Sequence, residues 1–182
     1  MLARGGAMSP YSGLGSTHSN LLKRLEFGII EGYELGEVHE YKISKNPFTR
    51  LWKRWFSGPS RVSKLANKND VIHITDQEQA GLIPANKNSV ITVHDLFHLF
   101  PSVRMDVEIG EKNPSSIRKK DLKKIKSGIS RAKLLICVSK DTQQECEMRF
   151  PGIPTAWIPH AINLDNYQIE TERPKWFKDG IN

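Results

Sequence analysis

The stretch SVITVHDLFHLF, residues 89–100, begins as an apolar run and changes abruptly at His94 and Asp95. Two similar runs occur elsewhere in the chain, DVIHIT at 70–75 and KLLICVS at 133–139. Each is rich in β-branched residues or leucine, lacks strict alternation and is bounded by polar residues. Such runs are typical of strands covered on both faces of a parallel sheet. The sequence therefore predicts three buried parallel strands.

Segments with helical periodicity separate these runs. They predict helices at 16–27, 59–68, 117–133 and 140–150. Strands that alternate with helices form βαβ units with right-handed crossovers. The predicted fold class is therefore α/β, a single-domain Rossmann-like parallel sheet flanked by helices.

Three further strands are less clearly marked. Short strands are expected near 36–43 and at 155–162. The segment MLARGGAM, residues 1–8, should hold the first strand, but Arg4 and two glycines split its apolar residues. The first strand is therefore expected to be short or missing.

Composition narrows the class of protein. A chain of 182 residues suits one domain, and its two cysteines, Cys137 and Cys146, lack metal-ligand spacing and are expected to be free thiols. No stretch approaches the roughly 18 apolar residues that a membrane-spanning helix needs, and MLARGGAMSP lacks the apolar centre of a secretory signal. The expected location is the cytoplasm.

The formal net charge is +7, and much of it lies within residues 117–133. Helical spacing puts Ile117, Leu122, Ile125 and Ile129 on one face. The other faces carry the membrane-surface candidates Lys119, Lys120, Lys123 and Lys124. They form either a solvated helix face or a docking surface for anionic lipid headgroups, which would make the protein peripheral at the inner face of the membrane. No nucleic acid is expected as a partner, because no aromatic residue is interleaved with the lysines.

A second basic segment is rich in aromatic residues. NPFTRLWKRWFSGP, residues 46–59, mixes large apolar side chains with Arg50, Lys53 and Arg54. Helical spacing of Phe48, Trp52, Trp55 and Phe56 predicts mostly core positions. The alternative is that this segment rests on a membrane surface.

Polar residues gather where the predicted strands end. In parallel α/β sheets, ligands bind just beyond the carboxyl ends of the strands. This places His73, Asp76, His94, Asp95 and Ser139 along one edge of the sheet. A metal site built from His73, His94 and Asp95 fits by residue type but lacks a compact spacing, so no metal is expected.

The segment PYSGLGSTHSN, residues 10–20, lies where a first strand would lead into a first helix. Gly13 and Gly15 permit close backbone approach, and the helix start behind them offers N–H groups to a phosphate. A plain turn explains the two glycines equally well. The dinucleotide fingerprint requires a glycine where this chain has His18, so that reading fails.

In order, the motifs SGLG, DVIHITDQ, VITVHDLF, LLICVSKDTQQE and IPHAIN resemble the amino-terminal half of a family 4 glycosyltransferase of GT-B fold. The resemblance spans most of residues 9–166. It implies that residues 1–166 are an amino-terminal, acceptor-side domain and that 167–182 are a truncated interdomain linker.

The resemblance also implies a function. The family transfers a sugar from a nucleotide-sugar donor to a glycan or lipid acceptor with retention of configuration, and needs no metal or other cofactor. Carried over, Gly13, Leu14 and Gly15 would bind the donor phosphate, and His94 with Asp95 would be the catalytic pair. The acceptor-side cleft would contain His73, Asp76 and Ser139.

Departures from the family pattern limit this expectation. The chain has IPHAIN at 158–163 where the family usually has IPNGVD, and the donor-binding domain is expected to be absent. The module alone should then be inactive or weak. Three accounts stay open: a gene fragment, a half-enzyme that assembles with a separate donor-binding domain, or a non-catalytic phosphate- or anionic-lipid-binding module.

Overall fold

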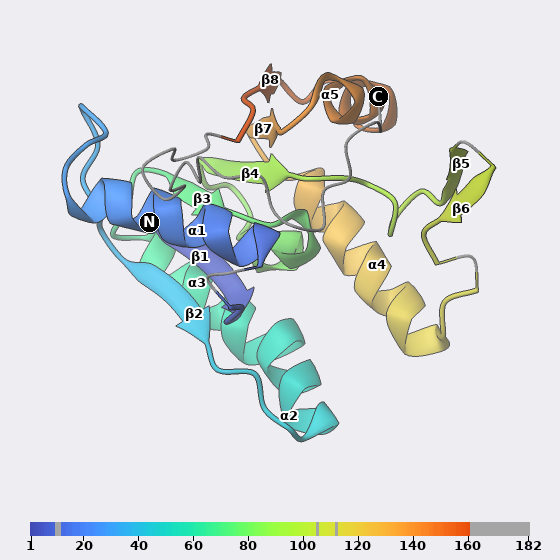
Figure 1. Cartoon of the computed structure of the whole chain (residues 1–182). Coiled ribbons are helices and arrows are strands. Elements are labelled where there is room, and N and C mark those ends of the chain that lie inside the picture. The colour runs from blue at the N-terminus through green and yellow to red at the C-terminus, as the bar shows by residue number, and fades with distance from the viewer. Residues whose placement is uncertain (10–11, 105, 112, 161–182) are drawn as a thin grey trace, which may run out of the picture.

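Six parallel strands form one sheet in the order β2-β1-β3-β4-β7-β8 (Figure 1). The structure is a computed structural model, and it describes residues 1–9, 12–104, 106–111 and 113–160. The strands of the sheet are β1 (Leu2–Gly6), β2 (Val38–Tyr41), β3 (Ile72–Ile74), β4 (Ser89–Val93), β7 (Leu134–Cys137) and β8 (Thr155–Trp157). An antiparallel hairpin of β5 (Ser102–Arg104) and β6 (Val107–Ile109), which the sequence did not predict, follows β4.

Helices fill most of the connections between these strands. They are α1 (Gly13–Glu26), α2 (Pro47–Trp52), the π-helical η1 (Lys53–Ser57), α3 (Gly58–Ala66), the 3₁₀-helical η2 (Gln77–Leu82), α4 (Ser116–Ile129) and α5 (Lys140–Arg149). The Rossmann-like α/β prediction is confirmed. The segments α2, η1 and α3 follow one another without a break.

The first strand is present although its sequence is weak. β1 lies between β2 and β3 and pairs with both, and Leu2 and Ala3 are buried. At the other edge, β8 is shorter than the predicted 155–162. Its ladder ends with the bond from the Ile158 N–H to the Cys137 carbonyl, and Pro159, which has no N–H, follows. Residues 161 and 162, like the expected linker at 167–182, lie outside the described residues.

The two faces of the sheet carry different helices. Because crossovers are right-handed, the strand order puts α1 on one face and α3, η2, α4 and α5 on the other. The main core lies on the second face. It includes Val62 and Ala66 of α3, Ile125 and Ile129 of α4, and the buried free thiols Cys137 and Cys146.

The buried face of α4 differs from the prediction. Ile125 and Ile129 are buried as expected, but Ile117 is 58% exposed and Asp121 is buried in its place. The cause is a close crossing with η2, where a Cβ at Gly128 would collide with the carbonyl of Ala80. This contact sets the rotation of α4, and it turns Asp121 inward.

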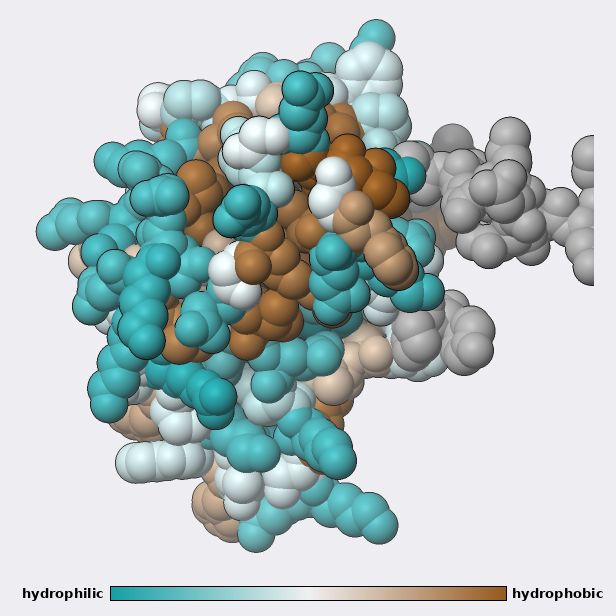
Figure 2. Space-filling model, turned by 90° about the vertical axis from the view of Figure 1, so that its left-hand side faces the viewer, coloured by the Kyte–Doolittle hydropathy of each residue, from teal (hydrophilic) through white to brown (hydrophobic). Residues whose placement is uncertain are grey.

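Apolar surface is not confined to the core. Figure 2 shows apolar side chains gathered near the centre of the side that lies to the left in Figure 1, with hydrophilic side chains around them. Folded domains commonly leave such surface in contact with water. Among the described helices, none combines the length and the apolar composition that crossing a bilayer requires.

Candidate functional site

The carboxyl ends of β3 and β4 bring one group of polar residues together. Thr75, Asp76 and Gln77 follow β3, and His94 follows β4 directly, at the position that the sequence predicts. All but His94 are nearly buried. At this edge of the sheet, the half-buried imidazole of His94 therefore lies next to buried polar residues.

His94 is held from several sides. Its backbone N–H donates to the Gln77 Oε1 at 3.0 Å, and its carbonyl accepts from the Thr142 hydroxyl at 3.2 Å. Its Nε2 lies 3.2 Å from the carbonyl oxygen of Thr75. Because a carbonyl can only accept, Nε2 must carry a proton, which leaves Nδ1 of the neutral ring as an acceptor.

The acceptor nitrogen of His94 faces a second histidine. Nε2 of His160 lies 3.1 Å from Nδ1 of His94, and the ring centroids are 5.0 Å apart. Burial, followed by the charge of His94, lowers the pKa of His160 below its ordinary value. His160 is itself exposed, so a ligand hydroxyl can take its place on Nδ1 without disturbing the core.

Thr75 links this histidine to helix α1. Its hydroxyl lies 2.8 Å from Nδ1 of His18, while its carbonyl holds His94. Burial, with the nearby charge of Arg4, lowers the pKa of His18 to about 4. Both His18 and Arg4 are buried, and His18 Nε2 and Arg4 Nη2 have no hydrogen-bond partner among the described residues. A buried arginine charge therefore lies near His18 in α1.

Asp76 is the buried acid of this group. Its Oδ1 accepts from the Glu78 N–H at 2.8 Å and so caps η2. Burial raises the pKa of Asp76 and the charge of Glu78 adds to this, whereas the N–H bond and the charges of His94 and Arg4 oppose it. Perturbed acids at a strand end are characteristic of functional sites.

The glycine turn differs in detail from its prediction. Helix α1 begins at Gly13, three residues before the predicted start, because Ser12 and not Ser16 or Thr17 caps it by accepting from the Gly15 N–H. A Cβ at Gly15 would collide with the carbonyl of Ser9. The Ser12 cap does not use the N–H groups of Gly13 and Leu14, which lie in the first turn of α1, where anions bind.

The remaining predicted site residues have local roles in the structure. Asp95 accepts from the Phe97 N–H at 3.2 Å, and among the described contacts no hydrogen bond joins it to His94. The Ser139 hydroxyl caps α5 by accepting from the Thr142 N–H, and it also shares a hydrogen bond with the Thr142 hydroxyl at 2.9 Å.

His73 lies within β3 and not at its end. Its Nε2 is 2.8 Å from the Thr92 hydroxyl on the neighbouring strand. Burial, with the charges of His18 and the N-terminal amine, lowers the pKa of His73 to about 4. In the described part of the chain, no three histidine, cysteine or acidic side chains converge as metal ligands.

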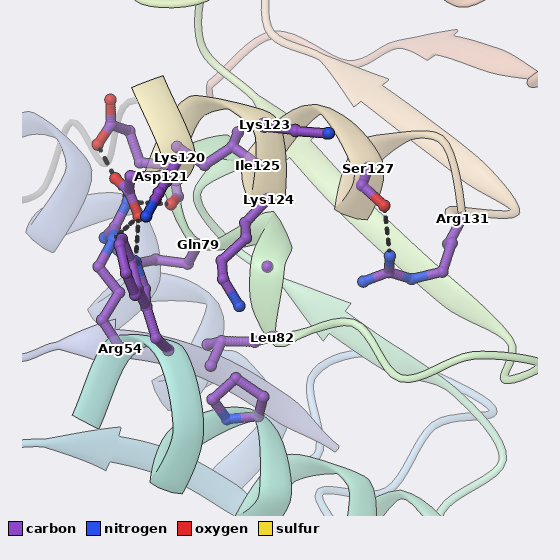
Figure 3. A pocket seen from close by; sticks show the side chains of 14 residues that line it. Arg54, Gln79, Leu82, Lys120, Asp121, Lys123, Lys124, Ile125, Ser127 and Arg131 are labelled. Carbon is purple, nitrogen blue, oxygen red and sulfur yellow. Dashed lines mark hydrogen bonds and ion pairs between the residues drawn. The ribbon is translucent and has the colours of Figure 1, made fainter. Parts of the chain in front are cut away.

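The predicted lysine surface lies elsewhere. A pocket of about 500 Å³ between η1, η2 and α4 is lined by Lys120, Lys123 and Lys124, while Lys119 does not line it (Figure 3). Neither His94 nor the glycine turn contributes to this pocket. The sheet edge and the lysine pocket are therefore separate surfaces.

Sequence reasoning missed several residues of the sheet edge. It did not single out Thr75, Gln77 or Thr142, and it treated His160 only as a departure from a motif. Thr75 acts through its backbone carbonyl, which leaves no signal in a sequence. His160 lies 66 residues from its partner, so only the fold brings them together.

Comparison with known proteins gives one family. The model of the family described as Glycosyltransferase Family 4 matches residues 21–166. The match contains β3, β4 and His94 but begins after the glycine turn and His18. A comparison with curated proteins found no match.

Proposed function

The chain belongs to glycosyltransferase family 4, and from this we propose that it is the amino-terminal, acceptor-side module of a retaining glycosyltransferase that uses a nucleotide sugar. The acceptor would be a glycan or a lipid. The nucleotide would be held mainly by a second, donor-binding domain facing the carboxyl edge of the sheet. The proposed site of action is the cytoplasm, including the inner face of the membrane.

The observation that carries this proposal is the fixed orientation of His94. Its Nε2–H is tied to the Thr75 carbonyl, so Nδ1 is the nitrogen that faces outward. A sugar hydroxyl that displaced His160 would donate to Nδ1, with no change in protonation. A hydrogen bond of this kind orients the transferred sugar, and positioning is a large part of the catalysis of group transfer.

The start of α1 supports the donor side of the proposal. A departing nucleoside diphosphate gains negative charge, and preorganised N–H donors stabilise such charge. The N–H groups of Gly13 and Leu14, in the first turn of α1, are the proposed donors.

The other site residues take supporting roles in this proposal. Asp95 would keep the turn after His94 in shape through its bond to Phe97. Asp76 and Ser139 would line the acceptor side, with His73 beneath them. The proposal includes no metal or other cofactor, since the N–H groups at the start of α1 would bind the phosphate.

Ligand binding tests the role of His94 without requiring turnover. Saturation-transfer NMR with uridine, guanosine and adenosine diphosphate sugars should detect contacts between the chain and the sugar protons of one donor. His94→Ala should weaken that binding about tenfold, the effect of roughly 1.4 kcal/mol of lost hydrogen bonding. His98→Ala is the matched control, because His98 lies in the same loop and half of its side chain is exposed. Equal binding by both variants would remove His94 from the site.

A further inference from the structure

Three aromatic side chains form an exposed ridge on α2 and η1. Phe48, Trp52 and Phe56 are 80%, 61% and 54% exposed, and they follow one another at intervals of four residues. The rings of Trp52 and Phe56 stack with centroids 5.1 Å apart. The prediction that the helically spaced aromatics are mostly core residues is therefore wrong for these three, which we call the aromatic ridge.

The opposite side of the same helical segment explains this orientation. Arg54 Nε donates to the Asp121 Oδ1 at 2.7 Å, and Trp55 Nε1 donates to the same oxygen at 3.0 Å. Asp121 is buried on α4. These bonds anchor Arg54 and Trp55 to α4, whereas the three side chains of the ridge stay exposed.

Positively charged lysine side chains lie beside the ridge. Lys124 extends from α4 toward the helix that carries Arg54 (Figure 3), and its Nζ lies 5.5 Å from the Trp55 ring and 5.7 Å from the Phe56 ring. Lys120 and Lys123 line the same pocket. Lysines and aromatic rings that are far apart in the sequence therefore form one continuous surface.

The acidic residues of this pocket do not neutralise the lysines. Asp121 is paired with Arg54 and Arg118 at 2.7 and 2.9 Å, and Glu78 is paired with the same two arginines at 3.6 and 2.9 Å. Two carboxylates are thus matched by two guanidinium groups. Among the described residues, no ion pair joins these lysines to a carboxylate, so they remain as net positive charge in the pocket.

We propose that the aromatic ridge and the pocket lysines form a docking surface for a bilayer that contains anionic phospholipid. Phe48, Trp52 and Phe56 enter the interfacial layer, where amphipathic aromatic side chains are stable. Lys120, Lys123 and Lys124 then lie against lipid phosphates, which attract basic residues near the membrane surface. This inference rests on exposed surface and charge, and it does not depend on the role proposed for His94.

The shape of the surface favours lipid over single-stranded nucleic acid. Nucleic-acid sites stack successive bases along a basic groove. Here the aromatic rings stand on the end of a helical segment that extends away from the sheet (Figure 1). Phenylalanine side chains exposed on such a projection fit an acyl-chain boundary, where both faces of each ring can be covered.

Vesicle sedimentation provides the test. The purified chain should bind phosphatidylcholine vesicles containing phosphatidylglycerol and not vesicles of phosphatidylcholine alone. Salt should weaken the binding because screening acts on exposed charges. Lipids brominated on their acyl chains should quench tryptophan fluorescence, and Trp52→Phe should remove most of that quenching while binding persists.

Matched variants distinguish an effect of this surface from an effect of net charge or exposed apolar area elsewhere on the protein. Lys124→Glu should weaken vesicle binding at least about fivefold, since each basic residue near an anionic membrane contributes roughly that factor. Lys23→Glu makes the same charge change on α1, on the other face of the sheet, and should have a smaller effect. Phe48→Ser should weaken binding, whereas Phe27→Ser, which alters a 76% exposed ring at the end of α1, should not.

Two outcomes would overturn the proposal. Equal losses in the surface variants and their controls would mean that binding follows net charge alone. Binding to a single-stranded oligonucleotide that Phe48→Ser and Lys124→Glu abolish, without vesicle binding by the unaltered chain, would assign the surface to nucleic acid. All five substituted side chains are exposed, so circular dichroism should report a fold identical to the parent.

Discussion

His94 and His160 face each other with Nδ1 and Nε2 3.1 Å apart, and the second ring is the exposed one. A pair of imidazoles in contact cannot easily carry two positive charges. Protonation of one ring therefore opposes protonation of the other. The pair provides a spectroscopic test of the geometry of the sheet edge.

We expect His160 to titrate below the ordinary histidine value, because burial and the charge of His94 both lower its pKa. In His94→Ala, the pKa of His160 should rise, since the opposing charge and part of the burial are removed. The imidazole proton signals in NMR spectra recorded across pH 4 to 8 give this midpoint. If the titration midpoint of His160 is the same in His94→Ala as in the parent, the two rings are not in contact.

Acid should destabilise the fold before carboxylates titrate. Burial lowers the pKa of His18 to about 4 from its ordinary value of 6.5. The unfolded chain then binds a proton that the folded chain does not, so stability should fall as the pH drops from about 6.5 to about 4. The slope should be about 1.4 kcal/mol per pH unit at most for this residue.

Urea unfolding at several pH values measures this effect. His18→Gln removes one titrating ring and should lower the slope of the pH dependence. The slope should not reach zero, because burial also lowers the pKa of His73 to about 4. The variant should also be less stable at pH 7, because it loses the contact with Thr75. His98→Gln, on an exposed ring, should leave the profile unchanged. A parental slope in His18→Gln would contradict the assignment.

Breaking the anchor beneath the aromatic ridge should be costly. Burial alone would raise the pKa of Asp121, but the hydrogen bonds and charges of Arg54, Trp55 and Arg118 outweigh it and lower that pKa. Asp121→Asn removes the nearest counter-charge of the partly buried Arg54 and leaves Glu78 to pair with both arginines. It should lower the free energy of unfolding by about 3 kcal/mol. Glu111→Gln, which removes an exposed partner of Arg118, should cost less than about 1 kcal/mol. Similar losses in both variants in urea titrations would show that the Asp121 network is not special.

The sequence predicts the centre of the sheet better than its edges. β3, β4 and β7 follow directly from apolar runs, because a strand buried on both faces must be apolar throughout. β1 contains a buried arginine and two glycines, and it is held by the strands on either side. Pairing with neighbouring strands leaves no local pattern in the sequence, so the sequence alone predicts β1 poorly.

The candidate site was predictable only where it follows a strand. His94 lies at a strand end, and the parallel sheet alone places it at the ligand-binding edge. The contacts that orient it come from Thr75, Thr142 and His160, which depend on tertiary structure. The ridge was misjudged for a related reason, since helical spacing identifies a common face but not the direction in which that face points.

The π-helical turn Lys53–Ser57 divides the continuous helical segment formed by α2, η1 and α3. Side chains before and after this turn face different surroundings. Phe48 and Trp52 before it and Phe56 within it are exposed, whereas Val62 and Ala66 after it are buried in the core. A π-turn accommodates one additional residue within an otherwise α-helical path. Deleting one residue there would restore a regular helix and rotate its two ends relative to each other by about 100°. The outward ridge and the core-facing helix therefore depend on a single insertion, and an insertion or deletion of one residue at this position could gain or lose the ridge while α3 stays in place.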